Sequence, residues 1–294
     1  MGEPALKNTM SIYTPKNEQD WHHTRDKGIG ASEAAIILGK SSFMSPLMLF
    51  YVKRCEIPRP DDTDLTLAGK LFEPQILKWF QQETGFKTTH NAKQSIYMRD
   101  IYFCTPDAFV NDGRIDTFAE IKFSIYDDGF KDDVPVKYLI QCQHQMYVAD
   151  LPYMYLAYFA LGKFNYRVIS RNDDFIQILI QREREFWNRI NQNEPPEAGA
   201  NDAVIFNLLY KNPIEEFVDL PEDMIVQDQR LQEIKPLIKE LENEKKTIEN
   251  RMKQLIGTTA GGVLPNGITY GITQVNKPET VVKATSYIQL RRRV

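Results

Sequence analysis

The clearest pattern of apolar and polar positions predicts two strands joined by a tight turn. Residues 101–110 are rich in β-branched and aromatic side chains, and residues 115–124 continue in an extended pattern. The Asn-Asp-Gly sequence at 111–113 is a strong turn signal between them. Because strand side chains alternate in direction, Glu120 and Lys122 share one face of the second strand. The pattern therefore predicts a β-hairpin that presents a carboxylate beside an ammonium group.

Helical patterns precede and follow this hairpin. A helix is expected over residues 65–83, with a kink or a restart at Pro74, because proline lacks a backbone donor and disfavours helical geometry before it. A second helix is expected from the acidic, proline-containing stretch 132–135 to near Asp150. A third covers residues 172–189, where apolar side chains recur at helical spacing, and we expect its aromatic side chains in the core.

The first part of the chain is expected to form one domain. Residues 153–161 and 164–170 are rich in strand-forming side chains and are separated by a Gly-Lys turn, so they extend the central sheet. The Asn-Glu-Pro-Pro-Glu stretch at 193–197 closes this part. We therefore predict a domain over residues 1–195 of the α/β (α+β) class, with a mixed central sheet flanked by helices.

Residues 196–294 form a C-terminal extension of different character. A helical arm is expected at about 222–256, with a small β-rich tail around Asn266-Gly267. The arm carries a seam at alternating spacings of three and four residues: Leu231, Ile234, Ile238, Leu241, Lys245, Ile248, Met252 and Leu255. Pro236 and the charge of Lys245 argue against long self-pairing. A helical hairpin, a coiled coil and a single helix packed on its own domain all remain open.

Composition narrows the class of protein. The chain has 294 residues, of which 42% are hydrophobic and 26% charged, as in ordinary soluble globular proteins. No apolar segment approaches the length of a signal or membrane span. Cys55, Cys104 and Cys142 show no C-x-x-C pairing, so neither a disulfide framework nor a zinc or iron–sulfur site is indicated. We expect one soluble domain with an appendage.

The candidate chemistry lies in Thr105-Pro106-Asp107, in Glu120-Ile121-Lys122 and in an upstream carboxylate, Glu73. Asp107 and Glu120 have hard oxygen ligands for a divalent cation, and Lys122 is placed to position or deprotonate an attacking water. This combination is typical of PD-(D/E)-x-K nucleases, which have a restriction-endonuclease-like core. Alternatively, Asp107 is a turn residue and Glu120 pairs with Lys122 on a solvated strand face.

Further segments lie in an order that resembles a known family. They are Trp21, Arg25, 28–35, 69–74, 105–107, 120–122 and 138–146. In this order they resemble the YqaJ viral recombinase family, which includes phage lambda exonuclease. The resemblance runs from about Trp21 to about Asn191. It implies that Glu73, Asp107 and Glu120 bind metal, that Lys122 is the catalytic lysine, and that Gln141 is an active-site glutamine on a following helix.

The resemblance also implies a pocket for the 5′-phosphate of a DNA end, formed by Arg25, Ser32 and Thr105. A guanidinium and two hydroxyls suit a dianionic phosphate, and Ser32 is expected at a helix N-terminus. Thr105 departs from the serine that the family has there but keeps the hydroxyl. Alternatively, Arg25 pairs on the surface with Asp26 or Glu33, Ser32 is only the N-cap of a helix over 33–38, and Glu73 is only a helix cap.

Three further side chains lie on the glutamine helix. Gln143 and Tyr147 fit the Q-x-x-x-Y pattern of RecB-type nucleases, so we expect them to support the site. His144 has no histidine or cysteine at ligand spacing, and we expect it at the surface or facing DNA. A net charge of −4 implies weak binding to bulk duplex. Binding then requires a local groove, for which Arg25, Lys122, Lys131 and Lys137 are candidates.

The function implied by the resemblance is a 5′ to 3′ exonuclease that degrades linear double-stranded DNA and leaves 3′ overhangs. It implies Mg²⁺ as cofactor, with Mn²⁺ as a substitute, a phage single-strand annealing protein as partner, and a homotrimer ring. A bacterial cytoplasm and a phage or prophage origin are expected, without a membrane. The alternatives are a restriction-like endonuclease and a non-catalytic DNA-binding or assembly protein. The latter is disfavoured because clustered carboxylates repel phosphate without a metal.

Overall fold

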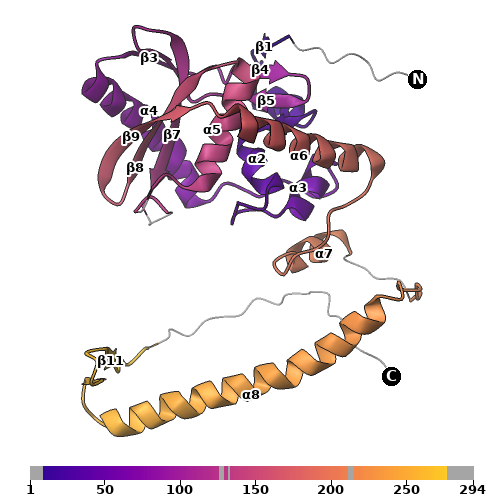
Figure 1. The fold of residues 1–294 in the computed structure, drawn as a ribbon, viewed down its shortest axis with the longest axis vertical. Helices are drawn as coiled ribbons and strands as arrows, with labels where there is room; N and C mark the ends of the chain where they lie inside the picture. The colour runs from indigo at the N-terminus through magenta and orange to yellow at the C-terminus, as the bar shows by residue number, and fades with distance from the viewer. Residues whose placement is uncertain (1–8, 126–128, 132, 211–214, 277–294) are drawn as a thin grey trace. The chain divides into compact units, whose positions relative to one another are not determined.

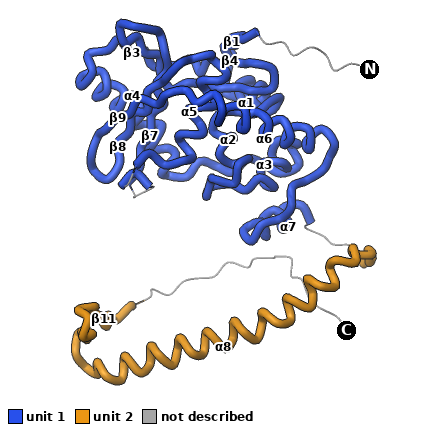
Figure 2. The backbone as a smooth tube through the Cα atoms, viewed as in Figure 1, with its two compact units in different colours: residues 1–211 blue, residues 212–294 orange. Residues whose placement is uncertain are grey.

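The structure, a computed structural model, describes residues 9–125, 129–131, 133–210 and 215–276. The chain divides into two compact units, Met1–Lys211 and Asn212–Val294 (Figure 2). Asp132, expected at the start of the glutamine helix, and Arg291-Arg292-Arg293, weighed as a DNA contact or a solvated tail, lie outside the described residues.

A mixed five-stranded sheet forms the centre of the first unit (Figure 1). Its strands, in spatial order, are β3 (Lys87–His90), β6 (Ala108–Asn111), β7 (Asp116–Ser124), β8 (Tyr153–Ala160) and β9 (Lys163–Ser170). β7 and β8 are parallel, and the other neighbours are antiparallel. The predicted β6–β7 and β8–β9 hairpins and the mixed sheet are therefore confirmed.

The predicted single strand over residues 101–110 is wrong. It is two strands in different sheets, β5 (Tyr102–Cys104) and β6, separated by Thr105-Pro106-Asp107. β5 lies in a four-stranded sheet with β1 (Ser11–Tyr13), β4 (Ile96–Arg99) and β2 (Ile29–Gly30). Proline has no N–H for a strand ladder and restricts the residue before it, so the chain changes sheet at Pro106. This break brings Asp107 to the edge where the two sheets meet.

The helices of the first unit are α1 (Glu18–Arg25), α2 (Ala31–Ile37), α3 (Pro46–Lys53), α4 (Asp64–Thr84), α5 (Val136–Ala149), α6 (Asp173–Gln192) and α7 (Ala203–Leu209). α4 does not restart at Pro74 but continues to Gly85, which has the left-handed φ of 70°. Its side chains Ile76, Leu77 and Phe80 are buried against the sheet. This packing stabilises the helix beyond the proline.

The two long helices α4 and α5 cover opposite faces of the five-stranded sheet. Ala119 and Ile121 of β7 pack with the α4 side chains, whereas Phe118 packs with Met146 of α5. Because side chains alternate along a strand, Glu120 lies on the α5 face. The fold thus places Glu120 on the sheet face that the glutamine helix, α5, covers; α4, α5 and β7 are labelled in Figure 1.

α6 and α7 complete the first unit. Asn172 accepts a hydrogen bond from the N–H of Phe175 and so caps α6 as predicted, and Phe186 is buried. Ile178, expected with the apolar residues of this helix, is instead 57% exposed. On α7, Ile205 is buried with residues of α3. The packing of the first unit therefore extends past the proline-rich stretch that was expected to close it.

The second unit contains one long helix and a small hairpin. α8 (Met224–Ile256) runs through Pro236, which confirms the predicted arm as a single helix rather than a helical hairpin. β10 (Gly261–Val263) and β11 (Thr269–Gly271) form the hairpin, and Gly267 in its turn has a φ of 84°. None of the helices in the described ranges combines the length and apolar content that a membrane span requires.

Candidate active site

Glu120 is the centre of the polar cluster under α5. Its side chain is 1% exposed, and its Oε1 accepts hydrogen bonds from Lys122 Nζ at 2.5 Å and from Gln141 Nε2 at 2.5 Å. Oε2 accepts a hydrogen bond from Gln145. Strand alternation puts Glu120 and Lys122 together, and helical spacing brings Gln141 and Gln145 to the same side. The alternative of a solvated surface pair is therefore wrong.

Asp107 lies beside this cluster. Its Oδ2 accepts a hydrogen bond from the backbone N–H of Ile121 at 2.7 Å. Burial raises the pKa of Asp107 well above its ordinary value, and the charge of Glu120 raises it further, while Lys122 opposes this only in part. Two carboxylates thus repel each other in a partly buried site. A divalent cation bound between them would relieve that repulsion, so the donor set fits a hard metal ion.

Lys122 remains charged in this environment. Burial alone would lower the pKa of Lys122, but the carboxylates of Glu120 and Asp107 raise it above its ordinary value. Its Nζ also lies 5.3 Å from the centre of the Tyr138 ring. A lysine that holds its proton this firmly can orient a water or stabilise negative charge. It is poorly suited to removing a proton, so the structure favours the positioning role over the deprotonating one.

Glu73 approaches the site from α4, on the other side of the sheet. Its Oε1 lies 2.7 Å from His90 Nε2, and its charge contributes to the raised pKa of Asp107. Within the described ranges, no three His, Cys, Asp or Glu side chains form a ready-made cation site. Glu73 is therefore near the other carboxylates but is held by His90. It would have to exchange this contact to join Asp107 and Glu120 around one ion.

Arg25, Ser32 and Thr105 line a single small pocket, and Gln141 lines it with them. Arg25 Nη2 donates to Ser32 Oγ at 3.1 Å, and the guanidinium lies 4.6 Å from the centre of the Trp21 ring. A Cβ at Gly30 would lie 2.3 Å from Arg25 Nη2, so a larger residue there would displace the guanidinium from this position. The three residues expected to bind phosphate thus come together from three separate segments.

Comparison with known proteins supports the resemblance found in the sequence. Residues 20–152 match the YqaJ-like viral recombinase domain, and they include every candidate site residue named above. This part of the chain is therefore similar to that domain family. The chain is also 26% identical, over an alignment of 267 residues, to the "Uncharacterized protein YqaJ" of Bacillus subtilis (strain 168). The alignment covers 85% of this chain and 82% of that protein.

Solved structures with similarity to the chain include an alkaline exonuclease, LHK-Exo, from Laribacter hongkongensis. It has a TM-score of 0.46 and 16% identity, over 60% of this chain and 94% of that chain. A phage-related exonuclease from Haemophilus somnus 129PT has a TM-score of 0.47 and 14% identity, over 56% of this chain and 94% of that chain.

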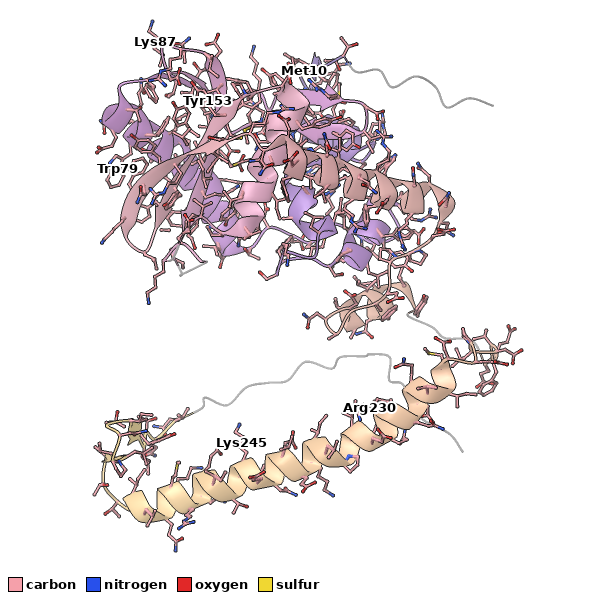
Figure 3. The ribbon with its side chains drawn as sticks, in the orientation of Figure 1. Met10, Trp79, Lys87, Tyr153, Arg230 and Lys245 are labelled. Carbon is pink, nitrogen blue, oxygen red and sulfur yellow. The ribbon has the colours of Figure 1, made fainter. Side chains whose placement is uncertain are left out.

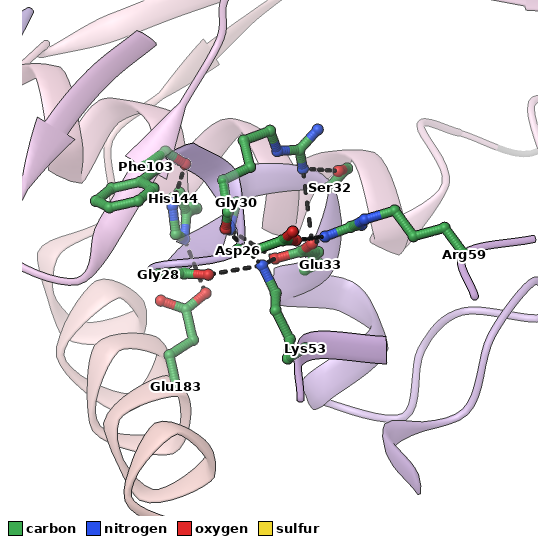
Figure 4. Close-up of polar contacts among 11 residues, drawn as sticks. Asp26, Gly28, Gly30, Ser32, Glu33, Lys53, Arg59, Phe103, His144 and Glu183 are labelled. Atoms are coloured by element: carbon green, nitrogen blue, oxygen red, sulfur yellow. Dashed lines mark hydrogen bonds and ion pairs between the residues drawn. The ribbon is translucent and has the colours of Figure 1, made fainter. Parts of the chain in front are cut away.

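A buried ionic cluster supports the pocket of Arg25, Ser32 and Thr105 (Figure 4). Glu33 Oε2 lies 2.7 Å from Lys53 Nζ, and Glu33 Oε1 lies 3.8 Å from Arg25 Nη2 and 3.5 Å from Arg59 Nη1. Lys53 also donates to the carbonyl of Gly28 at 2.6 Å. Burial alone would raise the pKa of Glu33, but these three cations lower it to about 2. Glu33 therefore stays ionised and holds Arg25 beside the pocket.

The start of α2 differs from the expected one. Gly30, not Ser32, is the N-cap, and its backbone N–H donates to Glu33 Oε2 at 2.8 Å. Ser32 is the second residue of the helix, so its position at a helix N-terminus is confirmed and the N-cap alternative is wrong. Its hydroxyl is free to face Arg25 because the glycine and the glutamate satisfy the cap.

The expected surface position of His144 is wrong. Its side chain is fully buried, with Nε2 3.0 Å from the carbonyl oxygen of Phe103 and Nδ1 2.8 Å from Glu183 Oε1 (Figure 4). Because a carbonyl only accepts, Nε2 donates, and one proton lies between Nδ1 and the carboxyl group. This contact joins α5 and α6 to β5 just before Thr105. Glu183 lies 39 residues away in sequence, so no local spacing indicates the pair.

The remaining residues on α5 divide by face. Gln143 Nε2 donates to the carbonyl of Ser170 at 2.8 Å, and Gln143 Oε1 accepts from the N–H of Asn172. Tyr147 packs edge-on against Tyr102. Neither reaches the carboxylates in the described contacts. Gln145, which was not among the predicted site residues, lies four residues after Gln141 on the same face of the helix and contacts Glu120 directly.

The carboxylate repulsion leads to a stability prediction. Asp107→Asn should raise the Tm of the protein in EDTA by about 3 °C or more, because it removes a disfavoured charge and keeps an oxygen for the Ile121 N–H. Mg²⁺ should then raise the Tm of the wild type but not that of the variant. Thermal unfolding followed by circular dichroism measures both effects. Asp61→Asn, at an exposed aspartate, is the control, and a lower Tm for Asp107→Asn in EDTA would contradict the repulsion.

Proposed function

We propose that this protein is a metal-dependent exonuclease that degrades linear double-stranded DNA in the 5′ to 3′ direction and leaves 3′ single-stranded overhangs. The observation that carries the proposal is the shared position of Gln141. It lines the pocket of Arg25, Ser32 and Thr105 and also donates to Glu120. A terminal phosphate in the pocket and a phosphodiester at the carboxylates would then lie on either side of one glutamine.

Each of these side chains would have a distinct role in such a reaction. Arg25 would bind the terminal phosphate with charge-assisted hydrogen bonds, and the hydroxyls of Ser32 and Thr105 would donate the remaining ones. Asp107 and Glu120 would hold the metal, with Glu73 as a further ligand. Lys122 and Gln141 would orient the attacking water. Bound Mg²⁺, or Mn²⁺ in its place, would supply Lewis-acid stabilisation of charge on the phosphate and on the leaving oxygen.

The charge of the chain bears on how DNA would be held. A net charge of −4 provides little nonspecific attraction for duplex. Sustained degradation would therefore need enclosure of the DNA, for which we propose a ring of three subunits. The 3′ overhang suits a phage single-strand annealing protein as the partner. The viral recombinase domain is in keeping with this role and with the cytoplasm of a bacterial host as the setting.

The proposal is tested with linear duplexes that carry a 5′-phosphate or a 5′-hydroxyl, in Mg²⁺ and in EDTA. We expect nucleotide release only with Mg²⁺, and release at least about tenfold faster from the phosphorylated end, the size of one charge-assisted contact. Arg25→Gln should remove the preference. Arg167→Gln should keep it, because Arg167 is exposed on β9 and donates only to its neighbours Asn165 and Tyr166 in the described contacts.

Other outcomes would point to the alternatives. Nicking of closed circular DNA without degradation of linear DNA would identify an endonuclease. DNA binding without cleavage under all metal conditions would identify a binding or assembly protein. The identity of the labelled end that is released first determines the polarity independently of the phosphate preference.

A further inference from the structure

The apolar seam of α8 is exposed along the helix. Ile238, Leu241 and Leu255 are 51%, 64% and 79% exposed, and no residue of α8 is buried. Figure 3 shows Arg230 and Lys245 among the side chains that project from this helix. A helix of 33 residues with such a face gains most of its stability from packing that face against another element. The seam therefore needs a partner.

The seam keeps one heptad register without a break from Leu231 to Leu255. In this register Leu231 occupies position a, and Pro236 falls at position f, opposite the seam. α8 continues through Pro236, so the proline leaves the apolar face intact. The only charged residue in the core positions is Lys245, at position a. The geometry is that of a two-stranded coiled coil with one polar layer.

Charges beside the seam argue against parallel pairing of two copies. In a parallel pair, positions g and e′ face each other, so Arg230 would meet the partner's Lys235, and Glu244 would meet the partner's Glu249. Both contacts join like charges. The two Lys245 side chains would also face each other in one core layer. Because the two-fold axis repeats each of the first two contacts, a parallel dimer would contain five like-charge contacts and no attractive one between these residues.

Antiparallel pairing replaces the like-charge contacts of Lys235 and Glu249 with an attractive one. With Leu231 opposite the partner's Leu255, positions e and e′ face each other, so Lys235 meets the partner's Glu249. The two-fold axis repeats this attractive pair at the other end of the coil. Each Lys245 now packs opposite the partner's Leu241.

The centre of such an antiparallel pair contains two like-charge contacts, because Glu242 faces the partner's Glu242 and Glu244 faces the partner's Glu244. Glu242 and Glu244 of both copies gather there, next to the two Lys245 side chains. The lysines thus face carboxylates, whereas in a parallel pair they would face each other. A single charged residue at a core position commonly fixes the register and the number of strands. The repulsion between two Lys245 side chains disfavours the parallel orientation, and their contacts with carboxylates favour the antiparallel one.

We propose that α8 pairs with α8 of a second copy of this chain as an antiparallel two-stranded coiled coil. The charge complementarity of Lys235 with the partner's Glu249 selects a second copy as the occupant of the seam. Because α8 has 33 residues, the rod is about 50 Å long at about 1.5 Å per residue, and the two chains enter it from opposite ends. This inference depends neither on the proposed nuclease activity nor on the proposed ring of three subunits, whose three arms could all be paired only with arms of a second ring.

The first test is the mass of the full-length protein by sedimentation over a range of concentrations. We expect wild-type self-association to weaken at least tenfold in the double variant Ile238→Lys and Ile248→Lys, because charges then occupy two core layers. Asn250→Lys, at the outer position f, should leave the mass unchanged. A mass unaffected by the seam variants overturns the proposal, whether the arm is then solvated or packed on its own chain.

A charge-exchange series separates the two orientations. In the antiparallel coil, Lys235→Glu and Glu249→Lys each weaken association, because each creates like-charge pairs, and the double variant restores it. In a parallel coil each single variant would strengthen association, since Arg230 would meet Glu at 235, and Glu244 would meet Lys at 249. Stronger association of either single variant overturns the antiparallel assignment. Circular dichroism of each variant confirms that the helix is retained.

Discussion

Lys122→Ala lowers the Mg²⁺-dependent release of nucleotides from linear duplex DNA by about 10²- to 10³-fold, the loss expected when a preorganised charge is removed from a reacting phosphate. The reason is geometric. Lys122 Nζ lies 2.5 Å from Glu120 Oε1, and its raised pKa keeps it charged between the carboxylates. In the described contacts no other cation donates to Glu120, and Arg25 lines the neighbouring pocket instead.

The control for this prediction is Lys163→Ala, at an exposed lysine at the start of β9. It should retain the wild-type rate. Rates are compared well below the Tm of each variant, because removing Lys122 also increases the repulsion between Asp107 and Glu120. A fully folded Lys122→Ala protein that degrades DNA at the wild-type rate would exclude the cluster as the catalytic site.

Glu33→Gln lowers the free energy of unfolding at neutral pH by about 3–5 kcal/mol, the usual cost of breaking a buried ion pair on one side. The variant leaves the fully buried ammonium of Lys53 without its carboxylate. Chemical denaturation measures the loss. Glu56→Gln is the matched control, because its pair with Arg54 is partly exposed, and it should cost at most about 1 kcal/mol.

We also expect Glu33→Gln to change how the stability of the protein depends on pH. The pKa of Glu33 is lowered to about 2 from an ordinary value of 4.5, so its stabilising effect is complete above pH 4.5 and is lost as the pH falls towards 2. The wild type should lose stability through this window, and Glu33→Gln should lose less. Equal slopes for the two proteins in acid would show that Glu33 does not contribute as an ion.

The pocket of Arg25, Ser32 and Thr105 is linked to Asp107 through the short strand β5 and the loop that follows it. Phe103 accepts from His144, and Cys104 and Thr105 follow it into the pocket. The chain then passes Pro106 to reach Asp107. A change in the buried His144–Glu183 pair would therefore act on the pocket and on the carboxylate of Asp107 at the same time, although neither residue touches them.

Local periodicity alone determined several features of this protein. Alternation along a strand places Glu120 and Lys122 on one face, and the seam of α8 follows from its heptad spacing. The turn at 111–113 was likewise predicted from three residues. Each of these features depends on neighbours within a few residues, and the backbone geometry that relates such neighbours is the same in every protein.

Only the tertiary structure decided which of these faces meet. It divided the predicted strand at Pro106 between two sheets, buried His144 against Glu183, and held Glu73 at His90. It also chose Gln145 over Gln143 as the second glutamine on Glu120. The physical reason is that burial and pairing depend on side chains brought together from distant segments. Spacing along the chain specifies the direction of a side chain, but only packing specifies what it contacts.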